Sequence, residues 1–265
     1  MRLKSCFKRL GAANKKALVP YILAGDPLGK TVDVMHELVK SGADILELGF
    51  AFSDPVADGP VIARAHERVV SQGVTLNDVF SMVSAFRDVD NNTPIVLMGY
   101  LNPVEIMGYG TFVKRASDAG VDGVLMVDLP PEAAGELMEL LHAQGMDMIN
   151  LITPTTSDER IRKICSVASG YLYYVSLKGV TGSAKLNLDE VQERVVHIRQ
   201  FTRLPVAVGF GIRDGKSAAA ISQVADAVIV GSVLVSELAK YSDEGQSCIH
   251  RVSERMTDMR SAMDR

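Results

Sequence analysis

The sequence has no tryptophan, and aromatic residues make up only 6% of its 265 residues. Cysteine is also scarce: Cys6, Cys165 and Cys248 are far apart, odd in number and form no C-x-x-C pair. This pattern favours reduced, structural thiols over a disulfide framework. No apolar run approaches the roughly 20 residues of a membrane span, and no apolar segment follows the basic N-terminus as in a secretory signal. We therefore expect a soluble, cytoplasmic protein.

Dense runs of one charge are absent as well. The formal net charge is −4, and no cluster of lysine or arginine suggests a nucleic-acid or membrane partner. No serine–histidine–acid arrangement can be assembled at the predicted strand ends. None of the histidines is spaced as a metal ligand, and all fall in predicted helices: His36, His66, His142, His197 and His250. The sequence therefore predicts acid–base chemistry without a bound metal or a covalent intermediate.

Short apolar runs alternate along the chain with longer amphipathic segments. Several of these runs lack polar alternation, which is typical of strands buried on both faces. The eight runs are 20–25, 44–50, 95–100, 123–128, 147–152, 172–176, 205–210 and 226–231. Strict alternation of strand and helix favours a parallel sheet with right-handed crossovers, and a (β/α)₈ barrel needs about 250 residues. The α/β pattern predicts a closed TIM barrel, with an open doubly wound sheet as the alternative.

Amphipathic segments supply the helices between these strands. They cover 29–41, 62–89 (as two helices), 110–119, 131–144, 157–168, 189–200 and 215–224. Outside the repeating unit, 4–16 predicts an extra N-terminal helix that plugs the barrel bottom. A short extra helix after the eighth strand is predicted at 232–240, and a closing helix at 246–263. No linker or low-complexity tract divides the chain, so we expect residues 1–265 to form one domain.

Two glycine-rich turns follow the last two predicted strands. Gly209 and Gly211 lie in the first turn, and Gly231 and Ser232 in the second. Barrels often hold a phosphate between the loops after their seventh and eighth strands, at the N-terminus of a short helix. Glycine lets backbone N–H groups approach the phosphate closely, and the helix end adds a favourable dipole. Together with the turn at 179–182, these turns predict a phosphate site.

Acidic residues gather around the end of the second predicted strand. By alternation, Glu47 shares a face with Ile45 and Gly49, so we expect it to point into the barrel mouth. Partial loss of water there raises the pKa of a carboxyl group, which suits a general acid or base. Asp54 and Asp58 lie in the following loop, and each either faces the pocket or is solvated.

The other strand ends are mostly apolar or aromatic. They are Tyr21, Leu23, Met98, Tyr100, Met126, Ile152, Tyr173 and Phe210. Several aromatics at strand ends favour a flat hydrophobic pocket for a ligand that is part apolar and part phosphate. One acid belongs to this group: Asp128 ends the fourth strand, and it is either functional or the cap of a helix that starts near Pro130.

Taken together, these motifs resemble one enzyme family. The stretch ILELGFAFSDPVADGP (45–60) is similar to the signature of tryptophan synthase α subunits, E-L-G-x-P-F-S-D-P-x-A-D-G-P. Further motifs follow in the family's order and spacing: PYILAGDP (20–27), YLNPV (100–104), GVLMVDLPPE (123–132), SLKGVTG (176–182), VGFGI (208–212) and VGS (230–232). The similarity covers roughly residues 17–235.

The resemblance implies a lyase of tryptophan biosynthesis, which splits indole-3-glycerol phosphate into indole and glyceraldehyde 3-phosphate by a retro-aldol reaction. It implies that Glu47 is the acid/base, that Asp58 hydrogen-bonds the indole N–H, and that Thr181 closes over the site. The phosphate is expected at Gly182, Gly211, Gly231 and Ser232. The indole ring is expected among Tyr21, Met98, Tyr100, Tyr173 and Phe210.

The resemblance also implies a partner. Asp54, Asn102 and Pro103 are expected to face a β subunit in an α2β2 assembly. That subunit is expected to carry pyridoxal phosphate, and no cofactor is expected on this chain. Three alternatives stay open: another phosphate-binding barrel enzyme, a free-standing indole-releasing lyase, and a non-catalytic barrel that only activates a partner.

Several positions depart from the family pattern. Ala51 stands where proline is usual, and Val61 and Ala63 replace a common threonine and glutamine. Leu177 replaces a frequent arginine, and Tyr21 stands where phenylalanine is usual. Ala51 leaves the backbone of its loop less restricted than proline would. The order of this loop and its coupling to a partner are the properties that these departures affect.

Overall fold

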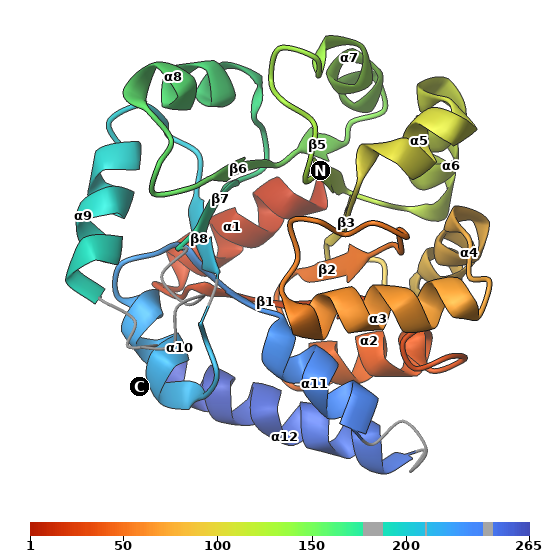
Figure 1. Ribbon diagram of the computed structural model, residues 1–265. Coiled ribbons are helices and arrows are strands. Elements are labelled where there is room, and N and C mark those ends of the chain that lie inside the picture. Colours follow the sequence, from red (N-terminus) through yellow and green to blue (C-terminus); the bar gives the residue numbers. More distant parts are fainter. Residues whose placement is uncertain (177–187, 210, 241–245) are drawn as a thin grey trace.

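The computed structural model describes residues 1–176, 188–209, 211–240 and 246–265. Within these ranges, helices surround a central ring of parallel strands (Figure 1). The strands are β1 (Ala17–Leu23), β2 (Leu46–Gly49), β3 (Ile95–Gly99), β4 (Gly123–Met126), β5 (Asp147–Met148), β6 (Asn150–Ile152), β7 (Leu172–Val175), β8 (Val206–Gly209) and β9 (Ala227–Val230). Every predicted apolar run therefore contains a strand, and only the fifth run is divided in two.

The order of the strands closes the sheet into a barrel. Neighbours follow the order β5-β4-β3-β2-β1-β9-β8-β7-β6, and every pairing is parallel. The two ends of this order, β5 and β6, are separated in the chain by Ile149 alone. The N–H of Ile149 donates to the carbonyl of Val124 on β4 at 2.9 Å, so the strand continues across the break. The closed eight-stranded barrel is confirmed, and the open doubly wound sheet is excluded.

The helices lie where the amphipathic segments predict them, with two differences. They are α1 (Arg2–Ala12), α2 (Thr31–Lys40), α3 (Pro60–Ser71), α4 (Leu76–Arg87), α5 (Leu101–Met107), α6 (Tyr109–Ala119), α7 (Gly135–Ala143), α8 (Asp158–Val167), α9 (Leu188–Ile198), α10 (Gly215–Ser222), α11 (Ser232–Lys240) and α12 (Gln246–Met263). The short helix α5 was not predicted. Helix α7 begins at Gly135 rather than at 131, because turns at Pro130 and Pro131 precede it.

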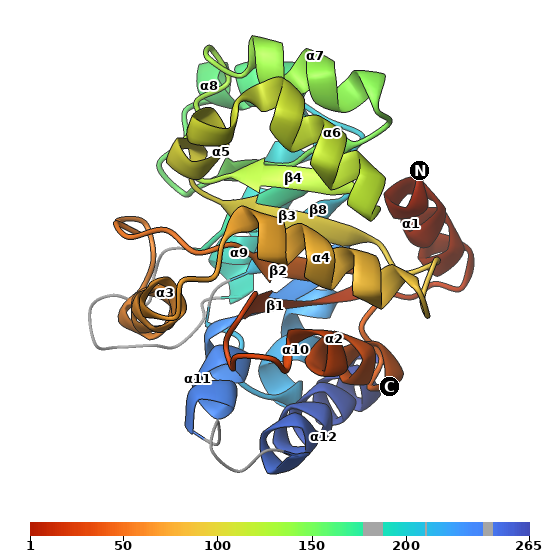
Figure 2. The same cartoon turned by 90° about the vertical axis from the view of Figure 1, so that its right-hand side faces the viewer.

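Alternating side chains sort into an inner and an outer core. The inner cluster includes Val19, Ile45, Val96 and Ile229, whereas residues on the other face of the same strands pack against the helices. Helix α1 contributes the buried side chain of Leu3 to the inner cluster, so it plugs the N-terminal end of the barrel as predicted. Figure 2 shows α1 at one end of the barrel and α3 at the other. Among the described residues, α1 therefore covers the interior at the amino ends of the strands.

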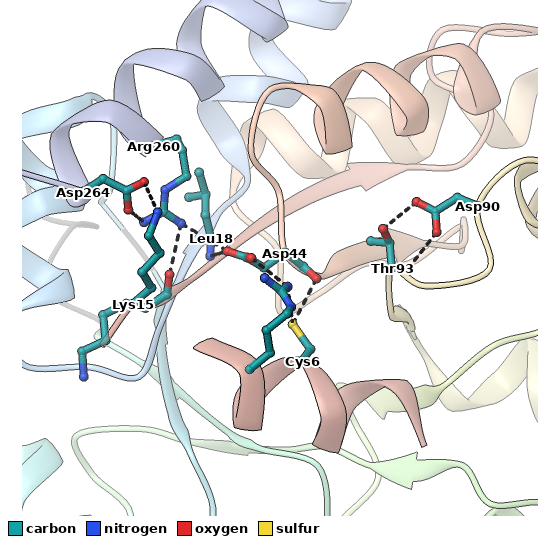
Figure 3. Close-up of polar contacts among 10 residues, drawn as sticks. Cys6, Lys15, Leu18, Asp44, Asp90, Thr93, Arg260 and Asp264 are labelled. Atoms are coloured by element: carbon teal, nitrogen blue, oxygen red, sulfur yellow. Dashed lines mark hydrogen bonds and ion pairs between the residues drawn. The ribbon is translucent and has the colours of Figure 1, made fainter. Parts of the chain in front are cut away.

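Below the barrel, one carboxylate joins several distant segments. Oδ2 of Asp44 accepts hydrogen bonds from the N–H of Leu18 at 3.1 Å and from Arg260 of α12 at 3.2 Å. Oδ1 faces Arg9 of α1 at 3.4 Å, and the Asp44 carbonyl accepts from the Cys6 thiol (Figure 3). These contacts tie α1, β1, the start of β2 and α12 together.

The Arg260 side chain is the link that reaches this cluster from the last helix. Its Nη1 also donates to the carbonyl of Lys16, its Nη2 donates to Asp264, and its stem lies against Gly42. Both Arg260 and Asp44 are largely shielded from water. Charge-assisted hydrogen bonds in such a setting contribute more than exposed ion pairs do.

We expect Arg260→Met to lower the free energy of unfolding by about 2 kcal/mol or more. Methionine keeps the contact with Gly42 but leaves Asp44 without its strongest cationic partner. Urea unfolding followed by circular dichroism measures the change. Arg265→Met, at an exposed position, is the charge-matched control and should change stability little. Equal effects of the two substitutions would contradict the role given to Arg260.

Candidate active site

The parallel strands bring the predicted site segments that the structure describes to one rim. Glu47 lies on β2, the loop with Asp58 follows β2, and Gly231 and Ser232 follow β9. Since every strand runs in the same direction, these segments meet at the carboxyl end of the barrel. The described residues contain no helix long and apolar enough to cross a membrane. They also contain no group of three or more histidine, cysteine, aspartate or glutamate residues that is placed to hold a metal ion.

Glu47 points into the interior of the barrel. Its neighbours in register are Tyr21 on β1 and Val96 on β3, and its side chain is 0% exposed. The hydroxyl of Tyr171, which precedes β7 on the far side of the barrel, donates to Oε1 at 2.5 Å. Oε2 is buried and has no hydrogen-bond partner in the described part of the chain. The carboxyl group is therefore held at one oxygen and unpaired at the other.

Burial sets the acidity of this group. Loss of water raises the pKa of Glu47 from 4.5 to about 7, although the hydrogen bond from Tyr171 acts in the opposite direction. A carboxyl group with a pKa near neutrality holds or releases a proton with little cost at the pH of the cell. This is the property that the sequence predicted for Glu47.

Two tyrosines reach across glycines of neighbouring strands at the barrel mouth. A Cβ at Gly49 would clash with the hydroxyl oxygen of Tyr21, and a Cβ at Gly209 would clash with that of Tyr173. Only glycine leaves room for such close crossings. Burial, followed by the charges of Glu47 and Asp58, raises the pKa of both tyrosines well above the ordinary value. The two neutral rings form apolar walls on either side of the interior.

The remaining inward positions are partly as predicted. Met98 is half-buried at the mouth and touches both the inner cluster and the cluster around Tyr21. Val127 and Leu151 also pack on the inner cluster, whereas Met126 and Ile152 belong to the outer core. Met126 and Ile152, which the sequence places among the strand ends, do not line the interior, because the alternation along β4 and β6 turns them toward the helices. Phe210 lies outside the described residues.

Asp58 is held at the mouth by Tyr100. The Tyr100 hydroxyl donates to Oδ2 of Asp58 at 2.8 Å and accepts from the N–H of Ala57 at 3.0 Å. Partial burial raises the pKa of Asp58, and the bond from Tyr100 and the nearby His66 oppose this shift. Tyr100 is fully buried against Phe52, so it anchors the loop after β2. Asp58 therefore faces the mouth and is not a fully solvated loop residue.

Sequence reasoning missed two residues that contact the predicted carboxylates. Tyr171 precedes its strand and therefore carries no strand-end signal. His66 lies on α3 and was grouped with the other helical histidines, but it accepts a hydrogen bond from the N–H of Phe52 and lies 3.6 Å from Asp58. Both contacts join segments that no local pattern in the sequence connects.

The predicted phosphate turn is present after β9. The N–H groups of Leu234 and Val235 bond to the carbonyl of Gly231, which makes Gly231 the residue that starts α11. The N–H groups of Ser232 and Val233 precede any possible intrahelical acceptor and are available to an anion. Gly211 has a φ of 77°, which favours glycine. Gly182 and Thr181 lie outside the described residues.

The predicted partner residues lie on the outer surface of the same rim. Asp54 and Asn102 are exposed, and Pro103 is half-buried in the first turn of α5. Two exposed apolar side chains accompany them: Val56, 89% exposed in the loop after β2, and Ile106, 80% exposed on α5. The two segments are joined by the hydrogen bond from the N–H of Ala57 to Tyr100, the residue before α5.

Asp128 caps a helix, but not the one that was considered. Its Oδ1 accepts from the N–H of Leu101 at 2.8 Å, so it stabilises the start of α5 rather than a helix near Pro130.

Two of the positions that depart from the family pattern lie at the mouth: Ala51 and Val61 pack against the buried cluster that contains Tyr21. Leu177 lies outside the described residues.

Comparison with known proteins decides the family. The profile of the family described as "Tryptophan synthase alpha chain" matches residues 7–264. The chain belongs to the tryptophan synthase alpha chain family. A curated relative of that name from Methylococcus capsulatus is 53% identical over 264 residues, with 99% of each chain covered. Another from Thioalkalivibrio sulfidiphilus is 54% identical, again over 99% of both chains.

Solved structures of the family share the fold. Tryptophan synthase subunit alpha from Legionella pneumophila superposes with a TM-score of 0.93 at 44% identity, over 99% of this chain and 98% of that chain. A structure of the tryptophan synthase a2b2 complex from Pyrococcus furiosus matches with a TM-score of 0.84 at 34% identity. That match covers 92% of this chain and 98% of the other. The likeness extends over nearly the whole barrel.

The raised pKa of Glu47 predicts a pH-dependent effect of Glu47→Gln on stability. The folded pKa of about 7 exceeds the ordinary value of 4.5, so this carboxyl group costs the wild type stability as pH rises through that window. Between pH 4 and pH 8, we expect the variant to gain about 3 kcal/mol relative to the wild type. Urea unfolding at both pH values measures this gain. Glu67→Gln, at an exposed position on the same rim, serves as the control; a gain independent of pH would refute the assignment.

Proposed function

We propose that this chain cleaves indole-3-glycerol phosphate to indole and glyceraldehyde 3-phosphate, as the α subunit of a tryptophan synthase. The observation that carries the proposal is the fully buried Glu47 carboxyl, with a pKa of about 7, whose charge acts on the nearby hydroxyls of both Tyr21 and Tyr173. An apolar pocket that contains Glu47, an acid with a near-neutral pKa, suits a flat aromatic ring that must be protonated on carbon. Membership of the family agrees with this reaction.

The reaction needs only one group to move protons. Protonated Glu47 gives its proton to C3 of the indole ring and then takes the proton of the hydroxyl next to the breaking bond. The carbon–carbon bond between the ring and the glycerol chain breaks, its electron pair restores the aromatic ring, and the alcohol carbon becomes the aldehyde. Glu47 ends in the protonation state in which it began. A pKa near 7 suits both half-reactions.

Asp58 supports the cation that this protonation creates. We assign its carboxylate to the indole N–H, where it stabilises the positive charge of the protonated ring. The Tyr100 hydroxyl already holds this carboxylate by a hydrogen bond. The carboxylate therefore does not have to move when the positive charge develops on the ring. Both carboxylates also raise the pKa of the Tyr21 and Tyr173 hydroxyls. This effect agrees with the two carboxylates and the two hydroxyls facing the same part of the barrel mouth.

The phosphate of the substrate is assigned to the opposite side of the mouth. Gly231 and Ser232 at the start of α11 provide backbone N–H groups and a hydroxyl, and Gly211 and Gly182 belong to the same proposed cradle. Thr181 is assigned to closure over the bound substrate. In this arrangement the indole ring lies toward β1–β3 and the phosphate toward β8 and β9.

The exposed rim is assigned to a β subunit. Asp54 shares the loop after β2 with Val56, and Asn102 and Pro103 share α5 with Ile106; a mixture of apolar and polar groups is typical of an interface. The partner, rather than this chain, is assigned the pyridoxal phosphate. The relative from Pyrococcus furiosus forms an a2b2 complex, and we propose the same assembly here.

An indole-release assay tests the reaction. Purified chain with indole-3-glycerol phosphate should release indole, and Glu47→Gln should lower kcat by about 10²–10⁴-fold because the proton donor is lost. Asp58→Asn should lower kcat by a smaller factor, since the amide keeps a hydrogen-bonding group but no charge. Glu67→Gln is the matched control and should retain wild-type turnover.

The outcomes separate the alternatives. Wild-type turnover in Glu47→Gln would overturn the assignment of the acid/base. Turnover that is high alone and unchanged by a β subunit would indicate a free-standing lyase, and absence of turnover with a β subunit present would indicate a non-catalytic activator. Turnover only on another phosphorylated substrate would assign the chain to a different barrel enzyme.

A substitution on α5 tests the partner surface. Ile106→Asp places a charge in the proposed apolar contact and should lower the affinity for a β subunit at least tenfold, without changing indole release by the isolated chain. Titration calorimetry with a purified β subunit measures the affinity. Val89→Asp is the matched control, because Val89 is a 78% exposed valine in the loop after α4, away from this rim. Equal affinities of the two variants would contradict the assignment.

A further inference from the structure

His66 is a buried histidine beside the loop that carries Asp58. All five histidines lie in the described part of the chain, and His66, 2% exposed, is the one that is fully buried. It projects from the first turns of α3 toward residues 52–58. Its ring meets that of Tyr100 edge to face, with 6.2 Å between centroids. A buried imidazole needs partners for both of its nitrogen atoms.

The contact at one nitrogen fixes the tautomer. The backbone N–H of Phe52 donates to Nδ1 of His66 at 3.0 Å. A nitrogen that accepts a hydrogen bond carries a lone pair and no proton, so in the neutral ring the proton lies on Nε2. The ring is therefore a donor on its Nε2 side.

That donor faces the Asp58 carboxylate. Nε2 lies 3.6 Å from Oδ2 of Asp58, and the same oxygen accepts the Tyr100 hydroxyl at 2.8 Å. A small movement turns the His66 contact into a hydrogen bond, and such contacts often shorten when a ligand is bound. His66 thus touches residue 52 with one nitrogen and residue 58 with the other, and it spans the loop between them.

We propose that His66 is a positioning residue: as a neutral, Nε2-protonated imidazole it fixes the Asp58 carboxylate at the site for the indole N–H. The proposal rests on the function assigned to Asp58 above. Tyr100, at the end of β3, donates to the same carboxylate oxygen, and His66 on α3 lies 3.6 Å from it. The two contacts together restrict the carboxylate to one orientation, which a single hydrogen bond would leave free to rotate.

The surroundings keep the ring neutral. Within the described ranges, the titratable groups that face it are Asp58 from the loop and Tyr100 from the end of β3. Burial lowers the pKa of His66, and the Asp58 charge opposes this shift without overcoming it. A proton on Nδ1 would also break the bond from Phe52. Acid pH should therefore release residue 52 and loosen the position of Asp58.

Nitrogen NMR of the intact protein tests the tautomer directly. With ¹⁵N-labelled histidine, the His66 signals are identified by their loss in His66→Gln. We expect an unprotonated Nδ1 and a protonated Nε2 from pH 8 down to below the ordinary histidine pKa of about 6.5. A proton on Nδ1, or titration at the ordinary value with rapid exchange between tautomers, would overturn the proposal. This measurement does not depend on the reaction that the protein catalyses.

Two substitutions separate the two ends of the ring. In His66→Asn, the side-chain oxygen of the introduced asparagine takes the place of Nδ1 and keeps the contact with Phe52. In His66→Gln, the longer side-chain amide takes the place of Nε2 and keeps a donor toward Asp58. The first variant therefore removes the contact under test, and the second variant preserves it.

The probes for these variants are 3-(indol-3-yl)propyl phosphate and its benzofuran counterpart, in which oxygen replaces the ring N–H. Calorimetry gives the dissociation constant of each probe. The constant for the benzofuran probe divided by that for the indole probe reports the contact between Asp58 and the indole N–H. We expect His66→Asn to reduce this ratio about fivefold and His66→Gln to reduce it less than about twofold.

The controls distinguish two failures. If the wild type binds both probes equally, the function assigned to Asp58 fails, and the proposal for His66 fails with it. If the wild type prefers the indole probe and His66→Asn keeps the full preference, only the positioning role is overturned. A merely structural histidine would weaken both probes alike and leave their ratio unchanged.

Discussion

The absence of water around the Glu47 carboxyl is the physical constraint on which the rest of the site depends. Burial moves the pKa of this group to about 7, and only one hydrogen bond, from Tyr171, opposes the shift among the described residues. An ionised carboxylate with a free oxygen in this position would be costly. The fold maintains this dryness from below, because α1 fills the N-terminal end of the barrel, and from the sides, because the strands are covered by helices.

The surroundings of the second carboxyl group, Asp58, favour its ionised form. Asp58 is 15% exposed and is hydrogen-bonded by Tyr100, so its ionised form is supported where that of Glu47 is not. Two acids at one mouth thus acquire different tasks through their surroundings alone. Gly49 and Gly209 complete the arrangement, since they leave room for Tyr21 and Tyr173 to approach the neighbouring strands closely.

Much of the fold and part of the site follow from the sequence. The eight apolar runs mark the strands because a strand covered on both faces must be apolar, and alternation places Glu47 inside because Ile45 must be buried on the same face. The list of strand-end residues failed at Met126 and Ile152 because it did not apply alternation: Ile149 and Leu151 face inward, so Ile152 faces outward. Tyr171 and His66 were missed because their contacts are made between separate elements of the fold. The cap on α5 by Asp128 was missed for the same reason.

Tyr100 has a double attachment with a mechanical consequence. Its hydroxyl holds Asp58, while its backbone is the residue immediately before α5, whose first N–H is fixed to Asp128. One residue therefore connects the outer helix to the inner acid, because Tyr100 precedes α5 in the chain and its hydroxyl binds Asp58. A change in the orientation of the first turn of α5 should therefore move the Tyr100 ring, and with it the Asp58 carboxylate.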